Sequence, residues 1–158
     1  IKIKKNSIGV DGCSAPQYAF PLHNLASSMI KIFDKNQTNK KYLQATKKLF
    51  SAIKLNPSLI GGNGRFDSEI IKTTKGRIFC KGGAEGVLLF CDNFNNIGGV
   101  IKVEDGNERA VAPIAIKIFY RLGLIKMNEK KFFDKWINHK IYNHAKTQVG
   151  EIFGTIKR

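Results

Sequence analysis

The segment "IFCKGGAEGVLLFCDNFNNIGGVIKV", residues 78–103, decides which fold we expect for this chain. It contains three short apolar runs, near residues 77–81, 87–92 and 98–103, separated by turns rich in glycine and asparagine. Short apolar runs joined by tight turns are typical of consecutive antiparallel strands. The segment therefore predicts an antiparallel meander in the middle of the chain.

The sequence on both sides of the meander shows helical periodicity. Segments in which apolar residues recur every three or four positions are 21–34, 39–54, 112–122 and 128–136. In the last of them we expect Phe132, Phe133 and Trp136 to face the core. A strand is expected within residues 1–10, and the tail 146–158 is compatible with a final one. Helices around a meander predict the α+β class, with an antiparallel sheet flanked by helices.

Length and composition indicate one globular domain over residues 1–158. The chain is 42% hydrophobic and 25% charged, without a low-complexity tract. No apolar run approaches the ~20 residues of a membrane helix, so we expect no membrane partner. Three cysteines do not suggest an exported disulfide framework, and we therefore expect a cytoplasmic location.

The net charge of +15 first suggests a nucleic-acid partner. However, only 5 of the 27 basic residues are arginines, whose planar fork suits base and phosphate recognition better than the lysine amine. The lysines are also scattered along the chain. We therefore interpret them as a solvated surface and expect no specific nucleic-acid partner.

Two of the cysteines flank the first hairpin of the meander. Closing the strands around the glycine turn pairs Cys80 with Val87, which leaves Cys91 away from Cys80. We therefore expect no disulfide between them and interpret both as small buried hydrophobic residues. Cys13 differs, because it lies in a loop close to Asp11.

Four polar loops combine glycines with charged residues. They are "DGCSAP" (11–16), "GGNGRFDSE" (61–69), "KGGAEG" (81–86) and "VEDGNERA" (103–110). Glycine lets backbone amides approach a ligand closely, so such loops are candidate binding elements. The alternative is that they are tight turns with solvated charges. In the second loop, Asp67 or Ser68 is also a candidate cap for the helix that follows.

The sequence "CKGG" places Lys81 and two glycines at the end of a predicted strand. This arrangement is similar to the K-T-G element of penicillin-binding proteins and β-lactamases, with glycine replacing threonine. That chemistry also needs a serine three residues before a lysine on one helix face. Two such pairs exist, Ser28 with Lys31 and Ser51 with Lys54, but both lie in lysine-rich helical patterns. We expect neither pair to be catalytic.

Taken together, "DGCSAPQYAFPLHNLA", "GRFDSEII", "GRIFCKGGAEGV" and "IKVEDGNERAVAPIA" resemble the C-terminal half of the rhizobial-type L-asparaginases, the asparaginase II family. The resemblance extends from about residue 8 to 152. It implies the fold of serine β-lactamases and glutaminases. It also implies hydrolysis of L-asparagine to L-aspartate and ammonia by serine–lysine chemistry.

The resemblance also assigns candidate residues. Lys81 resembles the lysine of the family's second serine–lysine pair. Cys13 resembles one ligand of a zinc site whose other ligands lie outside this chain. The candidate substrate-binding residues are Asp11, Arg65, Asp67 and Glu85.

The family's S-x-x-K helix, second serine and remaining metal ligands belong to an N-terminal half that has no counterpart here. We therefore expect residues 1–158 to be one domain, or the C-terminal portion of a larger asparaginase domain, inactive alone. It would act as a homodimer or by pairing with a separate N-terminal half. The alternatives are a non-catalytic ligand-binding or partner module and a basic nucleic-acid-binding protein.

Overall fold

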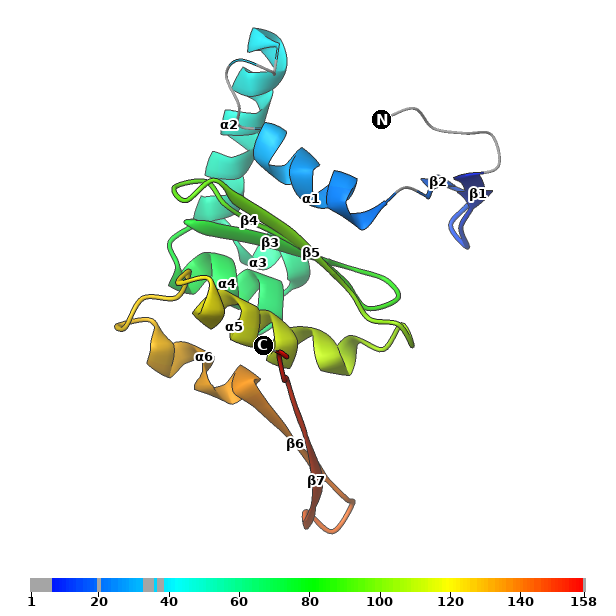
Figure 1. Cartoon of the computed structure of the whole chain (residues 1–158), viewed down its shortest axis with the longest axis vertical. Coiled ribbons are helices and arrows are strands. Elements are labelled where there is room, and N and C mark those ends of the chain that lie inside the picture. Colours follow the sequence, from blue (N-terminus) through cyan, green and yellow to red (C-terminus); the bar gives the residue numbers. More distant parts are fainter. Residues whose placement is uncertain (1–6, 20, 33–35, 37–38, 158) are drawn as a thin grey trace.

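A three-stranded antiparallel sheet lies at the centre of the protein, with helices on both faces (Figure 1). The computed structural model describes residues 7–19, 21–32, 36 and 39–157. The strands are β3 (Ile78–Gly83), β4 (Val87–Asp92) and β5 (Ile97–Lys102), in the order β3-β4-β5. The predicted meander is thus confirmed, and the chain has an α+β architecture.

The helices form two layers. On one face lie α1 (Leu22–Lys31) and α2 (Lys40–Leu55). On the other side lie α3 (Ser58–Gly61), α4 (Phe66–Thr73), η2 (Glu108–Ala110), α5 (Val111–Arg121) and α6 (Lys130–Ile137). No helix in the described part of the chain combines the length and apolar character needed to cross a membrane.

Two glycines of β5 bring the layers close together. A Cβ atom at Gly98 would lie 2.6 Å from the carbonyl oxygen of Ala26, so α1 rests directly on the strand. On the opposite face, a Cβ at Gly99 would lie 2.1 Å from the Phe90 ring, which spreads over the glycine. That ring meets Phe119 of α5 edge to face, with centroids 4.9 Å apart. The close packing of both helix layers on the sheet therefore requires glycine at positions 98 and 99, because neither position has room for a Cβ atom.

The register of the first hairpin corrects one prediction. Cys80 pairs with Phe90 rather than Val87, because β3 continues through its two glycines and Gly83 pairs with Val87. Both cysteines are nevertheless buried and free, as expected. Cys91 pairs with Phe79, so the two thiols belong to opposite faces of the sheet.

Helix α6 corrects a second prediction. Phe133 is fully buried, and Trp136 is partly buried against the core, but Phe132 is 62% exposed. The inward face of this short helix centres on Phe133 and Ile137. Phe132 is one residue, or about 100°, away from Phe133 around the helix and points to solvent.

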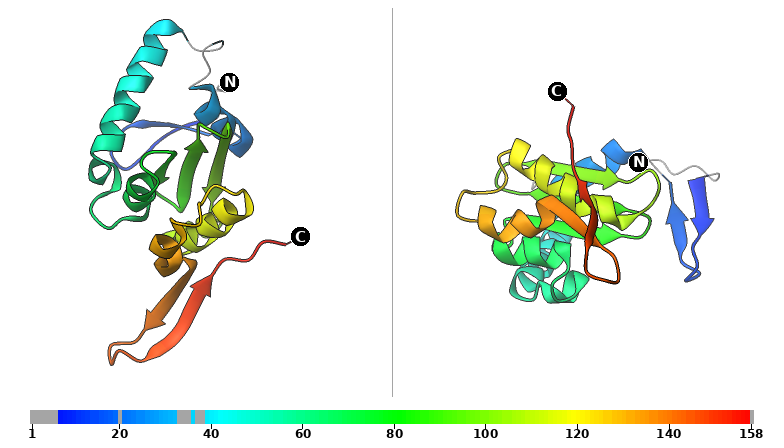
Figure 2. Two further views of the ribbon diagram at one scale, coloured as in Figure 1. Left: turned by 90° about the vertical axis from the view of Figure 1, so that its left-hand side faces the viewer. Right: turned by 90° about the horizontal axis from the view of Figure 1, so that it is seen from below.

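Two short hairpins extend from the layered body (Figures 1 and 2). The first pairs β1 (Ile8–Val10) with β2 (Pro16–Tyr18), while residues 1–6 of the predicted first strand lie outside the described residues. The second pairs β6 (Asn138–Tyr142) with β7 (Gln148–Phe153). The final strand was predicted, whereas β6 was not, because "NHKIY" lacks a clear apolar alternation.

A largely buried ion network holds the end of the sheet opposite the glycine turn. Arg77 donates to Asp92 at 3.0 Å, to Glu129 at 2.6 Å and to the Leu124 carbonyl at 2.6 Å. Asp92 is fully buried and also accepts amide hydrogens from the turn that follows β4. One guanidinium thus joins the start of β3, the end of β4 and the loop before α6.

Replacing Arg77 with methionine should lower the free energy of unfolding by about 3–5 kcal/mol, because Asp92 would remain buried without its cation. Urea denaturation measures this change. Arg109→Met is the matched control, since its ion pair with Asp105 is exposed and contributes at most about 1 kcal/mol. Equal losses in the two variants would contradict the structural role of the network.

Candidate functional site

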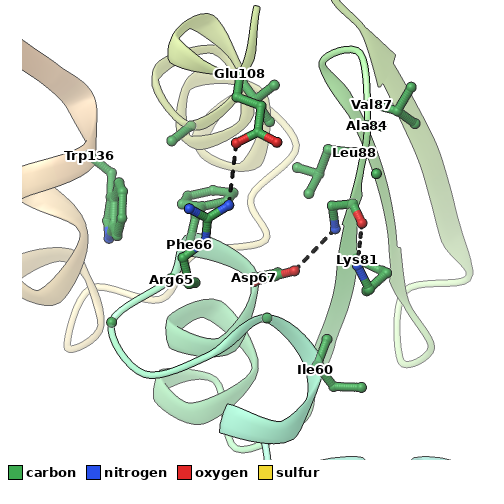
Figure 3. Close-up of a pocket in the computed structure, with 16 residues that line it drawn as sticks. Ile60, Arg65, Phe66, Asp67, Lys81, Ala84, Val87, Leu88, Glu108 and Trp136 are labelled. Carbon is green, nitrogen blue, oxygen red and sulfur yellow. Dashed lines mark hydrogen bonds and ion pairs between the residues drawn. The ribbon is translucent and has the colours of Figure 1, made fainter. Parts of the chain in front are cut away.

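A cavity of about 690 Å³ opens beside the edge strand β3, between α4, η2 and α6 (Figure 3). Its polar or aromatic lining residues include Arg65, Asp67, Lys81, Glu108 and Trp136. Three of these, Arg65, Asp67 and Lys81, were predicted as site residues from the sequence. Arg65 and Lys81 are separated along the chain by a helix and a turn, yet both line the same cavity. The fold therefore gathers residues from three of the four glycine loops at one cavity.

Lys81 is exposed near the end of β3 and is one of the residues that line the cavity. Its amine donates a hydrogen bond to the carbonyl oxygen of Gly82. Gly82 and Gly83 also line the cavity, so the strand presents backbone rather than side chains there. A polar ligand can therefore approach the strand backbone closely beside Lys81.

Asp67 of α4 forms a hydrogen bond with this strand. Its side chain is buried, and one carboxylate oxygen accepts the Gly82 amide hydrogen at 3.2 Å. The other oxygen accepts the amide of Ser68 at 2.9 Å. The N-cap position of α4 is Arg65, whose side chain makes no capping bond, while Asp67, one of the two predicted caps, accepts the Ser68 amide within the first turn. Asp67 also acts across the α4–β3 contact.

The Asp67 carboxylate also dictates the residue at position 61. A Cβ atom on Gly61 would lie only 1.9 Å from the nearer carboxylate oxygen. The Gly61 amide meanwhile donates to the Ser68 hydroxyl at 3.1 Å. The glycine loop is thus folded tightly around the first turn of α4.

Arg65 and Glu108 form an ion pair at 3.3 Å on the opposite wall of the cavity. Glu108 was not singled out from the sequence, although its loop was. Its partner lies 43 residues earlier, a separation that leaves no periodic pattern in the sequence. Only the packing of η2 near α4 reveals the pair.

An aromatic pair completes the wall. Phe66 meets Trp136 edge to face, with ring centroids 5.3 Å apart. The indole nitrogen of Trp136 is buried and has no hydrogen-bond partner in the described part of the chain. The cavity therefore combines an apolar side with charged groups of both signs.

A sequence profile of the family described as L-asparaginase II matches residues 1–153. The chain belongs to the L-asparaginase II family. No match to a curated protein was found. Family membership confirms the resemblance read from the glycine loops, since the match covers nearly the whole chain.

Glu85, which the resemblance to the L-asparaginase II family made a candidate substrate-binding residue, does not line the cavity. It occupies the tip of the β3–β4 turn with a φ of 61°, a left-handed conformation. Its carboxylate lies against Gly106, where a Cβ would be 2.5 Å from the nearer oxygen. Its carbonyl accepts a hydrogen bond from Lys102 at 2.7 Å. Glu85 therefore connects the β3–β4 turn with the turn that follows β5.

Asp11 and Cys13 lie in the β1–β2 hairpin and do not line the cavity either. Asp11 accepts hydrogen bonds from the amides of Cys13 and Ala15 and from the side chain of Gln17. Hydrogen bonds from the Cys13 thiol and amide lower the pKa of Asp11. Its carboxylate is thus already used by the hairpin.

A zinc site needs at least three protein ligands. Among the described residues, no cluster of three histidine, cysteine, aspartate or glutamate side chains exists. The residues around Cys13 therefore do not fit a zinc ion by themselves.

The two S-x-x-K pairs lie on α1 and α2, outside the lining of the cavity. The Ser28 hydroxyl donates to the Leu25 carbonyl at 2.7 Å, a bond within its own helix. Neither Ser28 nor Ser51 is therefore placed to react beside Lys81.

Replacing Gly61 with alanine should lower the free energy of unfolding by roughly 1–3 kcal/mol, because the new methyl group displaces the buried Asp67 carboxylate. Thermal or urea unfolding measures the change. Gly9→Ala is the control, since nothing lies within 4 Å of a Cβ at that position. Equal stability of the Gly61→Ala and Gly9→Ala proteins would show that the Asp67 carboxylate does not pack closely against position 61.

The thiols should differ sharply in reactivity. Burial, reinforced by the charge of Asp92, raises the pKa of Cys91 to about 12, and burial also raises the pKa of Cys80. At about pH 8 only roughly 10⁻⁴ of the Cys91 thiols are ionised, so iodoacetamide should modify exposed Cys13 alone. Mass spectrometry before and after unfolding tests this. Modification of all three thiols at similar rates in the folded protein would be the contrary result.

Proposed function

We propose that this chain binds L-asparagine in the cavity beside β3 and supplies the lysine for hydrolysis of its side-chain amide. The observation that carries this proposal is the position of Lys81 at the glycine-lined edge of a cavity, in a chain of the L-asparaginase II family. The products would be L-aspartate and ammonia.

The proposed chemistry is acyl transfer. A serine hydroxyl attacks the amide carbon, and Lys81 accepts the hydroxyl proton and passes it to the departing nitrogen. The C–N bond breaks as ammonia leaves, and an ester between serine and the aspartyl group remains. Water then hydrolyses that ester and restores the serine. The helices on both faces of the antiparallel sheet support a β-lactamase-like arrangement for this reaction.

The nucleophile is the missing element. No serine, threonine or cysteine lines the cavity in the part of the chain that the structure describes. We therefore propose that a serine from another polypeptide segment completes the site and that the 158-residue chain alone does not hydrolyse asparagine. The same observation favours a second candidate, a non-catalytic amino-acid-binding module.

Ammonia release from L-asparagine distinguishes these functions. The 158-residue chain should show no activity above background, and activity should appear when it is co-expressed with the S-x-x-K-bearing part of a family member. In that complex, Lys81→Met should lower kcat roughly 10²-fold or more, the scale of a lost acid–base group. Lys117→Met, on the exposed side of α5, is the control. Full activity in the Lys81→Met complex would reject the assigned role.

A further inference from the structure

Two opposite charges stand side by side at the mouth of the cavity. Arg65 occupies the N-cap of α4, and Glu108 begins η2. Their side chains approach to 3.3 Å and remain 63% and 62% exposed, respectively. Both residues line the cavity that contains Lys81 (Figure 3).

The fold does not require this pair. Exposed ion pairs contribute only about 0–1 kcal/mol to stability. Within the described residues, the contact between them is the single side-chain hydrogen bond that either group makes. A guanidinium carries five N–H donors and a carboxylate has about four acceptor positions. Most of the donors and acceptors of both groups therefore have no partner within the described residues and remain open to a ligand.

Adjacent charges of opposite sign match one class of ligand. An α-amino acid carries an ammonium and a carboxylate on the same carbon, and the arginine fork suits a carboxylate. We propose that Arg65 binds the α-carboxylate and Glu108 the α-ammonium group of the substrate. The ligand then replaces the Arg65–Glu108 contact with two charge-assisted contacts of its own.

This inference rests on the proposed function and deepens it, because it fixes the orientation of the substrate. With its α-carbon held at the Arg65–Glu108 wall, the side chain of asparagine extends into the cavity. Its amide then faces the strand edge that carries Lys81. Arg65 and Glu108 thus decide which amides are accepted, whereas Lys81 acts on the amide group.

The chain provides a matched control pair beside Glu108 in the sequence. Arg109 and Asp105 also approach to 3.3 Å and are similarly exposed, at 57% and 56%. Neither residue lines the cavity. Substitutions there remove the same charges from nearly the same surface without touching the proposed site.

The test is isothermal titration of the 158-residue chain with three amides. The ligands are L-asparagine, succinamic acid, which lacks the α-ammonium group, and 3-aminopropanamide, which lacks the α-carboxylate. The variants are Glu108→Gln and Arg65→Met, with Asp105→Asn and Arg109→Met as controls.

Glu108→Gln should weaken asparagine binding roughly tenfold to a hundredfold without weakening succinamic acid, because that ligand has no ammonium to lose. Arg65→Met should weaken asparagine to a similar extent without weakening 3-aminopropanamide. The control variants should bind all three ligands like the wild type. Uniform weakening of all ligands, unchanged asparagine binding in both site variants, or no asparagine binding to the wild type would overturn the inference.

Failure of the proposed function has a different signature. Ammonia release in the complemented complex reports on the reaction, while titration reports on recognition. Selective binding with no hydrolysis would leave the inference standing and reject the amidohydrolase. Hydrolysis with uniform binding losses would do the reverse.

Discussion

The hydrogen bond from the Gly82 amide to the buried Asp67 carboxylate is the constraint on which the site depends. A buried carboxylate is unfavourable unless donors satisfy it, so this contact fixes α4 against the edge of β3. It places Lys81, the neighbour of Gly82, at one side of the cavity. It also places Arg65, two residues before Asp67, at the other side. Moving either element would separate the amine from the guanidinium.

The strand that carries Lys81 is held at both ends by polar contacts. At its start, the Thr74 hydroxyl accepts the Ile78 amide at 3.2 Å, and the adjacent Arg77 binds two carboxylates. At its end, Asp67 binds Gly82. Between them, Cys80 packs in the core with no exposure. A strand fixed in this way can present an amine at a defined position, which acid–base chemistry requires.

The sequence reveals those parts of the fold that depend on local pattern. Strands β3 to β5 follow from the glycine and asparagine turns, and Lys81 stands out because two glycines follow it. The features that the sequence did not reveal depend on contacts between distant segments. Glu108 was not predicted, because it joins the site only through its contact with Arg65. Asp67 was predicted as a site residue, but its hydrogen bond to the Gly82 amide was not. Phe132 was misplaced for a related reason, since a run of aromatic residues does not say which member faces the core.

The location of the cavity follows from the sheet itself. An edge strand leaves backbone groups unpaired, which proteins normally cover. Here α4 covers the edge through Asp67, and the cover ends where Gly82 and Gly83 remove the side chains. The Lys81 amine donates a hydrogen bond to the Gly82 carbonyl. A ligand must therefore offer that amine an acceptor at least as good as a backbone carbonyl, a requirement that an amide or a hydroxyl meets and a hydrocarbon does not.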